Sequence, residues 1–179
     1  MSVMRFIDEI LSRLHSTHFP EALVAGGALR DYLTSREALI KDIDVFVEDK
    51  PCYLHYLSGA FHGWKHRLVV PAQAAEYMQF EGVTCVHEFI SPDNAIPVQV
   101  IVMGRKVGPI STIERHDFGP CQVAYDGEIM YRTEAFVNDL YNQTFTLVRC
   151  RDAKDRARSM KRWARLSTKF PTWSLVCPT

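Results

Sequence analysis

The sequence lacks an apolar run long enough to span a membrane, and its first thirteen residues lack the charged-then-apolar layout of a signal peptide. It also lacks a paired Cys-x-x-Cys motif. An odd number of scattered cysteines argues against both a disulfide framework and a zinc site. The five cysteines are Cys52, Cys85, Cys121, Cys150 and Cys177. We therefore expect a cytoplasmic protein that works in a reducing compartment, with no membrane partner.

A surplus of charge is also missing, because 21 Lys and Arg residues balance 21 Asp and Glu residues. A chain without net positive charge can bind nucleic acid only through a local basic patch. No internal repeat or low-complexity tract interrupts the 179 residues, of which 47% are hydrophobic. Length and composition thus predict one domain over residues 1–179 with a packed core.

The most informative stretch is residues 23–33 together with the strand pattern that follows it. It predicts a short buried strand, a turn at Gly26 and Gly27, a helix, and a second strand. Adjacent glycines let the backbone approach a ligand closely, and the first amide groups of the helix point toward the turn. Asp42 and Asp44 are two residues apart, so both carboxylates leave the same face of a strand. Paired carboxylates beside a phosphate cradle are hard ligands of the kind that hold Mg²⁺.

Helical and strand-like patterns alternate along the rest of the chain. Apolar residues at helical spacing predict an amphipathic helix over residues 3–14, and Asp152 offers an N-cap for a final basic helix over about residues 152–169. Asp49 predicts the start of a helix over residues 51–61. The other predicted elements are strands at 43–48, 68–70, 83–90, 97–103, 121–125, 129–131 and 144–148, helical turns at 72–77, and a helix at 133–140.

The glycine turn and the paired acids also match a known family pattern. Gly26-Gly27-x-x-Arg30-Asp31, followed by Asp42-x-Asp44, resembles the head-domain signature of the nucleotidyltransferase superfamily, which is DNA polymerase β-like. Bacterial-type CCA-adding enzymes and poly(A) polymerases are the most similar members. Three later segments fit the order of the same group: Arg115-His116-Asp117-Phe118, Ala124-Tyr125-Asp126, and the helix from Asp155 to Phe170. The resemblance implies an α+β fold with a mixed, mainly antiparallel sheet flanked by helices.

The resemblance also implies roles for individual residues. Asp42 and Asp44 would be the catalytic pair, binding Mg²⁺ or Mn²⁺ to activate a 3′ hydroxyl and stabilise the leaving pyrophosphate. Gly26 and Gly27 would contact the triphosphate through backbone amides. Arg30 has two possible partners, a phosphate group or a neighbouring carboxylate. The candidate nucleotide-binding residues are Gly26, Gly27, Arg30, Lys41, Arg115, Asp117, Arg156 and Arg158. Arg162 would join Arg156 and Arg158 in a basic face for the triphosphate or RNA.

The sequence departs from the family pattern in four places. Arg115-His116 replaces a double arginine, and Gly119-Pro120-Cys121-Gln122 replaces the usual polar turn. The position of the third acid holds Gln99, and Glu88 on the neighbouring strand can replace that acid only if it lies near the other two. The long helical extension that binds tRNA in the family is absent, as in small phage or mobile-element proteins.

Three functions stay open at this point. The first is metal-dependent transfer of a nucleotidyl group from a nucleoside triphosphate to an RNA 3′ end, most obviously that of tRNA. The second is transfer to a protein or a small molecule, as in toxin-like members of the superfamily. The third is a module that binds a nucleotide or a partner without catalysis.

Overall fold

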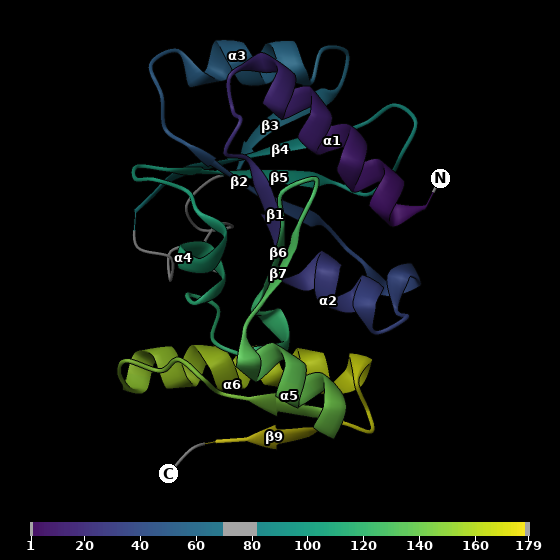
Figure 1. The fold of residues 1–179 in the computed structure, drawn as a ribbon, viewed down its shortest axis with the longest axis vertical. Coiled ribbons are helices and arrows are strands. Elements are labelled where there is room, and N and C mark those ends of the chain that lie inside the picture. Colours follow the sequence, from purple (N-terminus) through teal and green to yellow (C-terminus); the bar gives the residue numbers. More distant parts are fainter. Residues whose placement is uncertain (1, 70–81, 178–179) are drawn as a thin grey trace.

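A seven-stranded sheet forms the centre of the computed structural model, which describes residues 2–69 and 82–177 (Figure 1). The strand order is β3-β4-β5-β2-β1-β6-β7. β2 and β5 run parallel, and the other neighbours are antiparallel. The strands are β1 Leu23–Ala25, β2 Ile43–Glu48, β3 Lys65–Val69, β4 Val83–Ile90, β5 Val98–Met103, β6 Val123–Tyr125 and β7 Met130–Arg132. The prediction of an α+β fold with a mixed, mainly antiparallel sheet is confirmed.

Helices flank this sheet and form much of the C-terminal part. The described α-helices are α1 Val3–Thr17, α2 Gly27–Leu33, α3 Tyr53–Ala60, α4 Pro109–Ile113, α5 Glu134–Asn142 and α6 Ala153–Lys169. Short 3₁₀ turns lie at η1 Glu37–Leu39 and η3 Gly119–Cys121. Within the described ranges, no helix combines the length and apolar character that crossing a bilayer requires.

The two faces of the sheet differ because residues alternate along each strand. On β2, Val45 and Val47 are fully buried and belong to a core formed with α1 and α3. Asp44 and Phe46 point to the opposite face. There Phe46 packs in a second apolar cluster that includes Ile101 of β5 and Ile113 of α4. The acids of β2 therefore stand on a face that is only partly covered by apolar side chains.

A third apolar cluster holds the C-terminal part together. Phe118, Phe145 and Phe170 are completely buried in it, and Leu166 of α6 packs against them. In Figure 1, α5, α6 and β9 lie at the end of the molecule opposite α1 and α3. β8 (Thr144–Thr146) pairs in parallel with β9 (Ser174–Val176) in a separate two-stranded sheet. Packing of Leu166 in this cluster fixes which face of α6 turns toward α2.

Several predicted boundaries need correction. α3 begins at Tyr53 rather than Pro51, because Cys52 takes a left-handed conformation with φ of 60° and interrupts the helix. The edge strand β3 starts at Lys65, earlier than predicted, and β9 was not predicted from the sequence. The helical turns expected at residues 72–77 lie outside the described residues. The predicted N-caps Thr133 and Asp152 are confirmed, since both side chains accept a hydrogen bond from a first-turn amide.

Candidate active site

The paired acids of β2 line a cavity of about 170 Å³ between the sheet, α2 and α6. Asp42 lies just before β2, Asp44 lies within it, and both side chains are partly exposed. Six of the residues predicted for the site line this cavity: Gly27, Arg30, Lys41, Asp42, Asp44 and Arg162. The structure therefore brings together the glycine turn, the two carboxylates and three of the predicted cations.

Five cationic side chains and three carboxylates line the cavity, so its wall carries an excess of positive charge. Arg162, Arg165 and Lys169 are the cations that α6 contributes. Their spacing of three and four residues places them on one face of the helix. The basic face predicted from the sequence comprised Arg156, Arg158 and Arg162, and of these Arg162 alone is among the residues that line the cavity. The i, i+3, i+7 spacing was the available signal, but several faces of this basic helix carry such a pattern.

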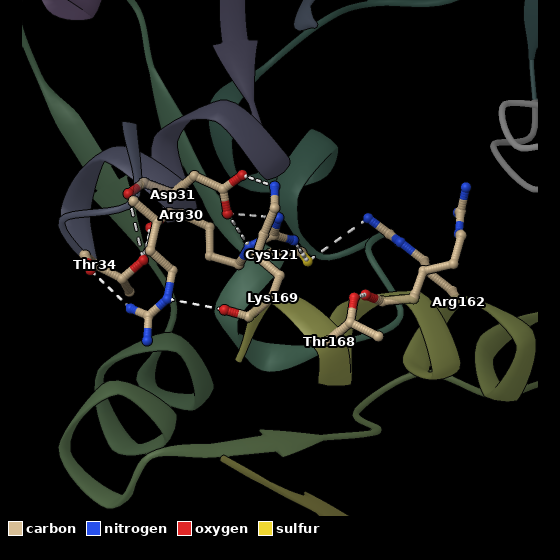
Figure 2. A network of polar contacts seen from close by, with 9 residues as sticks. Arg30, Asp31, Thr34, Cys121, Arg162, Thr168 and Lys169 are labelled. Carbon is tan, nitrogen blue, oxygen red and sulfur yellow. Dashed lines mark hydrogen bonds and ion pairs between the residues drawn. The ribbon is translucent and has the colours of Figure 1, made fainter. Parts of the chain in front are cut away.

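Asp31 connects α2 to α6 from a buried position. Its side chain is almost completely buried and accepts a hydrogen bond from Nε of Arg30 at 2.8 Å. Lys169 of α6 forms a second ion pair with the same carboxylate. Figure 2 shows these side chains converging from the two helices. For Arg30 the observed partner is thus the neighbouring carboxylate, while its side chain still lines the cavity.

Cys121 lies between two of the cavity's arginines (Figure 2). Its buried Sγ accepts a hydrogen bond from Nη1 of Arg30 at 3.2 Å and a longer one from Nη2 of Arg162 at 3.7 Å. Arg162 also donates from Nη1 to Oδ1 of Asp117 at 2.6 Å. The Cys121 sulfur thus joins the two guanidinium groups, while Asp31 holds Arg30 and Asp117 holds Arg162.

Gly26 forms the turn before α2 with a φ of +84°, a conformation that other residues rarely adopt. A Cβ at this position would lie 2.8 Å from Nε2 of His116. Burial, and then the positive charge of Arg162, lower the pKa of His116 to about 4, so its ring is neutral at neutral pH. The Gly26 amide donates to the carbonyl of Val123 at 2.9 Å. Because the Gly26 amide already donates to Val123, the predicted backbone contact with a triphosphate is left to Gly27, which lines the cavity.

The two candidates for a third metal ligand occupy different places. β2 and β5 pair Asp44 with Gln99, and β5 and β4 pair Gln99 with Glu88. Glu88 is thus two strands from Asp44, roughly 10 Å across the sheet. It forms a two-pronged ion pair with Arg67 of β3, at 2.6 and 3.1 Å. Among the described residues, no group of three or more His, Cys, Asp or Glu side chains converges as metal ligands.

The oxygen-bearing side chains around Asp44 nevertheless fit the coordination of Mg²⁺ or Mn²⁺. Asp42 and Asp44 are hard oxygen ligands on one cavity wall, and Gln99 is in register with Asp44. Mg²⁺ commonly binds one or two carboxylates and completes its coordination with water and substrate phosphate. A third carboxylate is therefore not required, and Gln99 rather than Glu88 is the better placed additional ligand.

Four predicted nucleotide-binding residues lie away from the cavity. The Asp117 carboxylate is buried and accepts hydrogen bonds from Ser159, Arg162 and its own neighbour's amide. Arg115 and Asp117 line a second, smaller cavity. Arg158 pairs with Asp155, and Arg156 is exposed. Contact of these four residues with the nucleotide stays a prediction. It is not favoured for a nucleotide in the first cavity, because none of the four lines that cavity.

Solved structures of CCA-adding enzymes share this fold. The Thermotoga maritima CCA-adding enzyme complexed with tRNA matches at 15% identity over 96% of this chain and 39% of that chain, with a TM-score of 0.68. A complex of CCA-adding enzyme with ATP matches at 15% identity over 97% of this chain and 39% of that chain, also with a TM-score of 0.68. A structure titled tRNA-processing enzyme with CTP matches at 16% identity over 86% of this chain and 39% of that chain, with a TM-score of 0.61. The chain spans about two fifths of these relatives, and it has a nucleotidyltransferase-like fold.

The sequence itself gives a more specific assignment. No curated protein matches it. A family model described as Gabija anti-defense 2 family protein matches residues 2–143, which include the whole seven-stranded sheet and the paired acids. Because this match covers well over half of the sequence, the chain belongs to the Gabija anti-defense 2 family.

Proposed function

We propose that the cavity beside Asp42 and Asp44 binds a nucleoside triphosphate and that the protein transfers its nucleotidyl group to an acceptor hydroxyl. The observation that carries this proposal is the meeting of paired carboxylates with five cationic side chains in one cavity. Similarity to CCA-adding enzymes, of which one solved structure contains ATP and another CTP, supports the proposal.

The cationic wall suits a triphosphate. Arg30, Arg162, Arg165 and Lys169 come from α2 and α6, and they offer guanidinium and ammonium donors from one side. Charge-assisted hydrogen bonds to phosphate are short and roughly twice as strong as neutral ones. Phe46 and the neutral ring of His116 give the same cavity a less polar wall. We assign the triphosphate to the cationic wall, with its α-phosphorus toward the paired acids.

The transfer step exchanges one phosphorus–oxygen bond for another. The acceptor hydroxyl oxygen attacks the α-phosphorus, the bond to the β-phosphate breaks, and pyrophosphate leaves while the hydroxyl proton goes to solvent or a nearby base. Asp42 and Asp44, with Gln99, would hold Mg²⁺ or Mn²⁺, which lowers the pKa of the attacking hydroxyl and neutralises charge on the leaving group. Lys169 and the α6 arginines would stabilise the negative charge that builds on pyrophosphate.

Two acceptor classes follow from different observations. The similar CCA-adding enzymes include a complex with tRNA, which favours an RNA 3′ end. The family description refers to anti-defence against Gabija, which favours a protein component of that system as the acceptor. We rank the RNA 3′ end first, because a protein with the same fold is found in complex with tRNA.

A transfer assay tests the function and separates the acceptors. The protein would be incubated with Mg²⁺ or Mn²⁺, each α-labelled nucleoside triphosphate in turn, and either tRNA or purified Gabija proteins. Label on RNA supports the first acceptor, and label on protein supports the second. No label with any combination, together with measurable binding of labelled nucleotide, would replace the proposal with a binding module that lacks catalysis.

The contact between Cys121 and the cavity arginines gives a further expected result. In Cys121→Val, Arg30 and Arg162 lose a hydrogen-bond acceptor, so the KM for the nucleoside triphosphate should rise by roughly tenfold with little change in kcat. Cys121→Ser retains an acceptor at this position and should recover most of the lost affinity. Steady-state kinetics of both variants provide the measurement. Equal KM values for the serine and valine variants would show that Cys121 only fills space.

A further inference from the structure

A second cavity lies on the far side of the Asp117–Arg162 ion pair. Arg115, Arg149 and Arg151 line it together with Asp117, Asp155 and Ser159. Its volume is about 20 Å³, enough for the centre of about one small polar group. The three arginines come from two segments: Arg115 follows α4, and Arg149 and Arg151 lie in the loop between β8 and α6. The fold thus gathers three guanidinium groups around one small space.

The carboxylates at this cavity are already engaged with other groups. Asp117 accepts from Arg162 at 2.6 Å and from Ser159 at 2.9 Å. Asp155 is shared between Arg151, at 2.7 Å, and Arg158. The hydrogen bond from Arg151 is the main cause that holds the pKa of Asp155 below its usual value. Both carboxylates are therefore already hydrogen-bonded to protein groups.

The charge balance favours an anion. Arg162 and Arg158, which do not line the cavity, pair with its two carboxylates, and Arg151, one of the three arginines that line it, also pairs with Asp155. Five arginines thus surround two carboxylates. Two further acids flank these arginines in the sequence, Glu114 before Arg115 and Asp152 after Arg151, and the Asp152 side chain accepts a hydrogen bond from the Asp155 amide. Guanidinium groups match the oxygen geometry of a phosphate group better than that of a single-point anion, and the cavity itself has room for about one phosphate oxygen.

We infer that this second cavity binds a phosphate group, and that in the proposed reaction this group belongs to the nucleic-acid acceptor. The Asp117–Arg162 ion pair separates the two cavities, with Asp117 facing one and Arg162 facing the other. A strand that reaches the paired acids can therefore place a backbone phosphate at Arg115 and Arg149. The identity of the strand as acceptor rests on the proposed function, whereas phosphate binding itself does not require transfer.

The test measures binding without metal and without nucleoside triphosphate, so it is independent of catalysis. A fluorescent single-stranded RNA of roughly twelve nucleotides and inorganic phosphate are the two probes. The test variant is Arg115→Ala combined with Arg149→Ala. Its matched control is Lys154→Ala combined with Lys161→Ala, which removes the same charge from exposed positions of α6 that line neither cavity.

We expect the arginine variant to lose at least tenfold in RNA affinity and to reduce the slope of log Kd against log salt by roughly one for each lost phosphate contact. The lysine control should change much less. Loss of inorganic phosphate binding alone would support the site and identify a small phosphate compound as its ligand. Equal binding of both probes by the two variants would overturn the inference. Circular dichroism and binding of labelled ATP at the first cavity check that each variant is folded.

Discussion

Asp44→Asn should reduce nucleotidyl transfer by roughly 10³-fold while it leaves the protein folded. Asp44 is a partly exposed carboxylate on the cavity wall, at a position in register with Gln99. Asparagine has nearly the same shape, but it removes the negative charge that a divalent cation needs. Initial rates with saturating nucleoside triphosphate, and thermal unfolding of the same samples, provide the measurement.

The matched control for this change is Asp93→Asn. Asp93 is an exposed aspartate in the turn between β4 and β5, and it does not line the cavity. Its replacement should leave the transfer rate within about twofold, as expected for a surface substitution. A transfer rate near that of the unmodified protein in Asp44→Asn would rule out a catalytic role for the paired acids.

Gly26→Ala should damage both stability and nucleotide binding. A φ of +84° is strained for alanine, and the new Cβ would lie 2.8 Å from the His116 ring. Strain of this kind costs on the order of 1–3 kcal/mol of the free energy of unfolding. His116 must move to relieve the contact, and it lines the cavity. We therefore expect a lower Tm together with a KM for nucleoside triphosphate that rises by roughly tenfold or more.

Gly59→Ala serves as the control for backbone strain. Gly59 lies within α3, has no positive φ, and has open space where a Cβ would be added. Alanine is the better helix former by roughly 0.5–1 kcal/mol, so this variant should be equally or more stable. If both glycine substitutions lowered the Tm alike and left the KM unchanged, the conformation of Gly26 would not matter for the cavity.

The segment from β1 to β2 was predictable because its signals are local. A buried strand, two glycines and alternating acids act within about twenty residues, and the structure forms these elements where the sequence placed them. The start of α3 was not predictable, since nothing in the sequence marks Cys52 as left-handed. β9 has only three residues and depends on a partner strand from a different segment. Such pairings are set by tertiary packing, which a local pattern does not contain.

Which basic residues of α6 would form the cationic wall of the cavity was likewise not predictable from a local pattern. The sequence identifies α6 as a basic helix, but a helix exposes several basic faces. Burial of Leu166 and Phe170 in the C-terminal core determines how α6 is rotated, and this rotation brings Arg162, Arg165 and Lys169 to the cavity. The partner of Glu88 was hidden for a similar reason, because Arg67 lies opposite it only once β3 pairs with β4.

The buried link between α2 and α6 has a consequence for how such a site can diverge. Three of the five cations at the cavity belong to α6, which begins after the residues that match the family model end. The paired acids lie at and just before β2, and Asp31 of α2 is joined to α6 through Lys169. A lineage that keeps Asp31 and Lys169 can exchange Arg162 and Arg165 on the cavity wall without losing the link between the two helices. Under the proposed function, ligand selection by α6 and metal binding by the paired acids would belong to separate elements that can evolve at different rates.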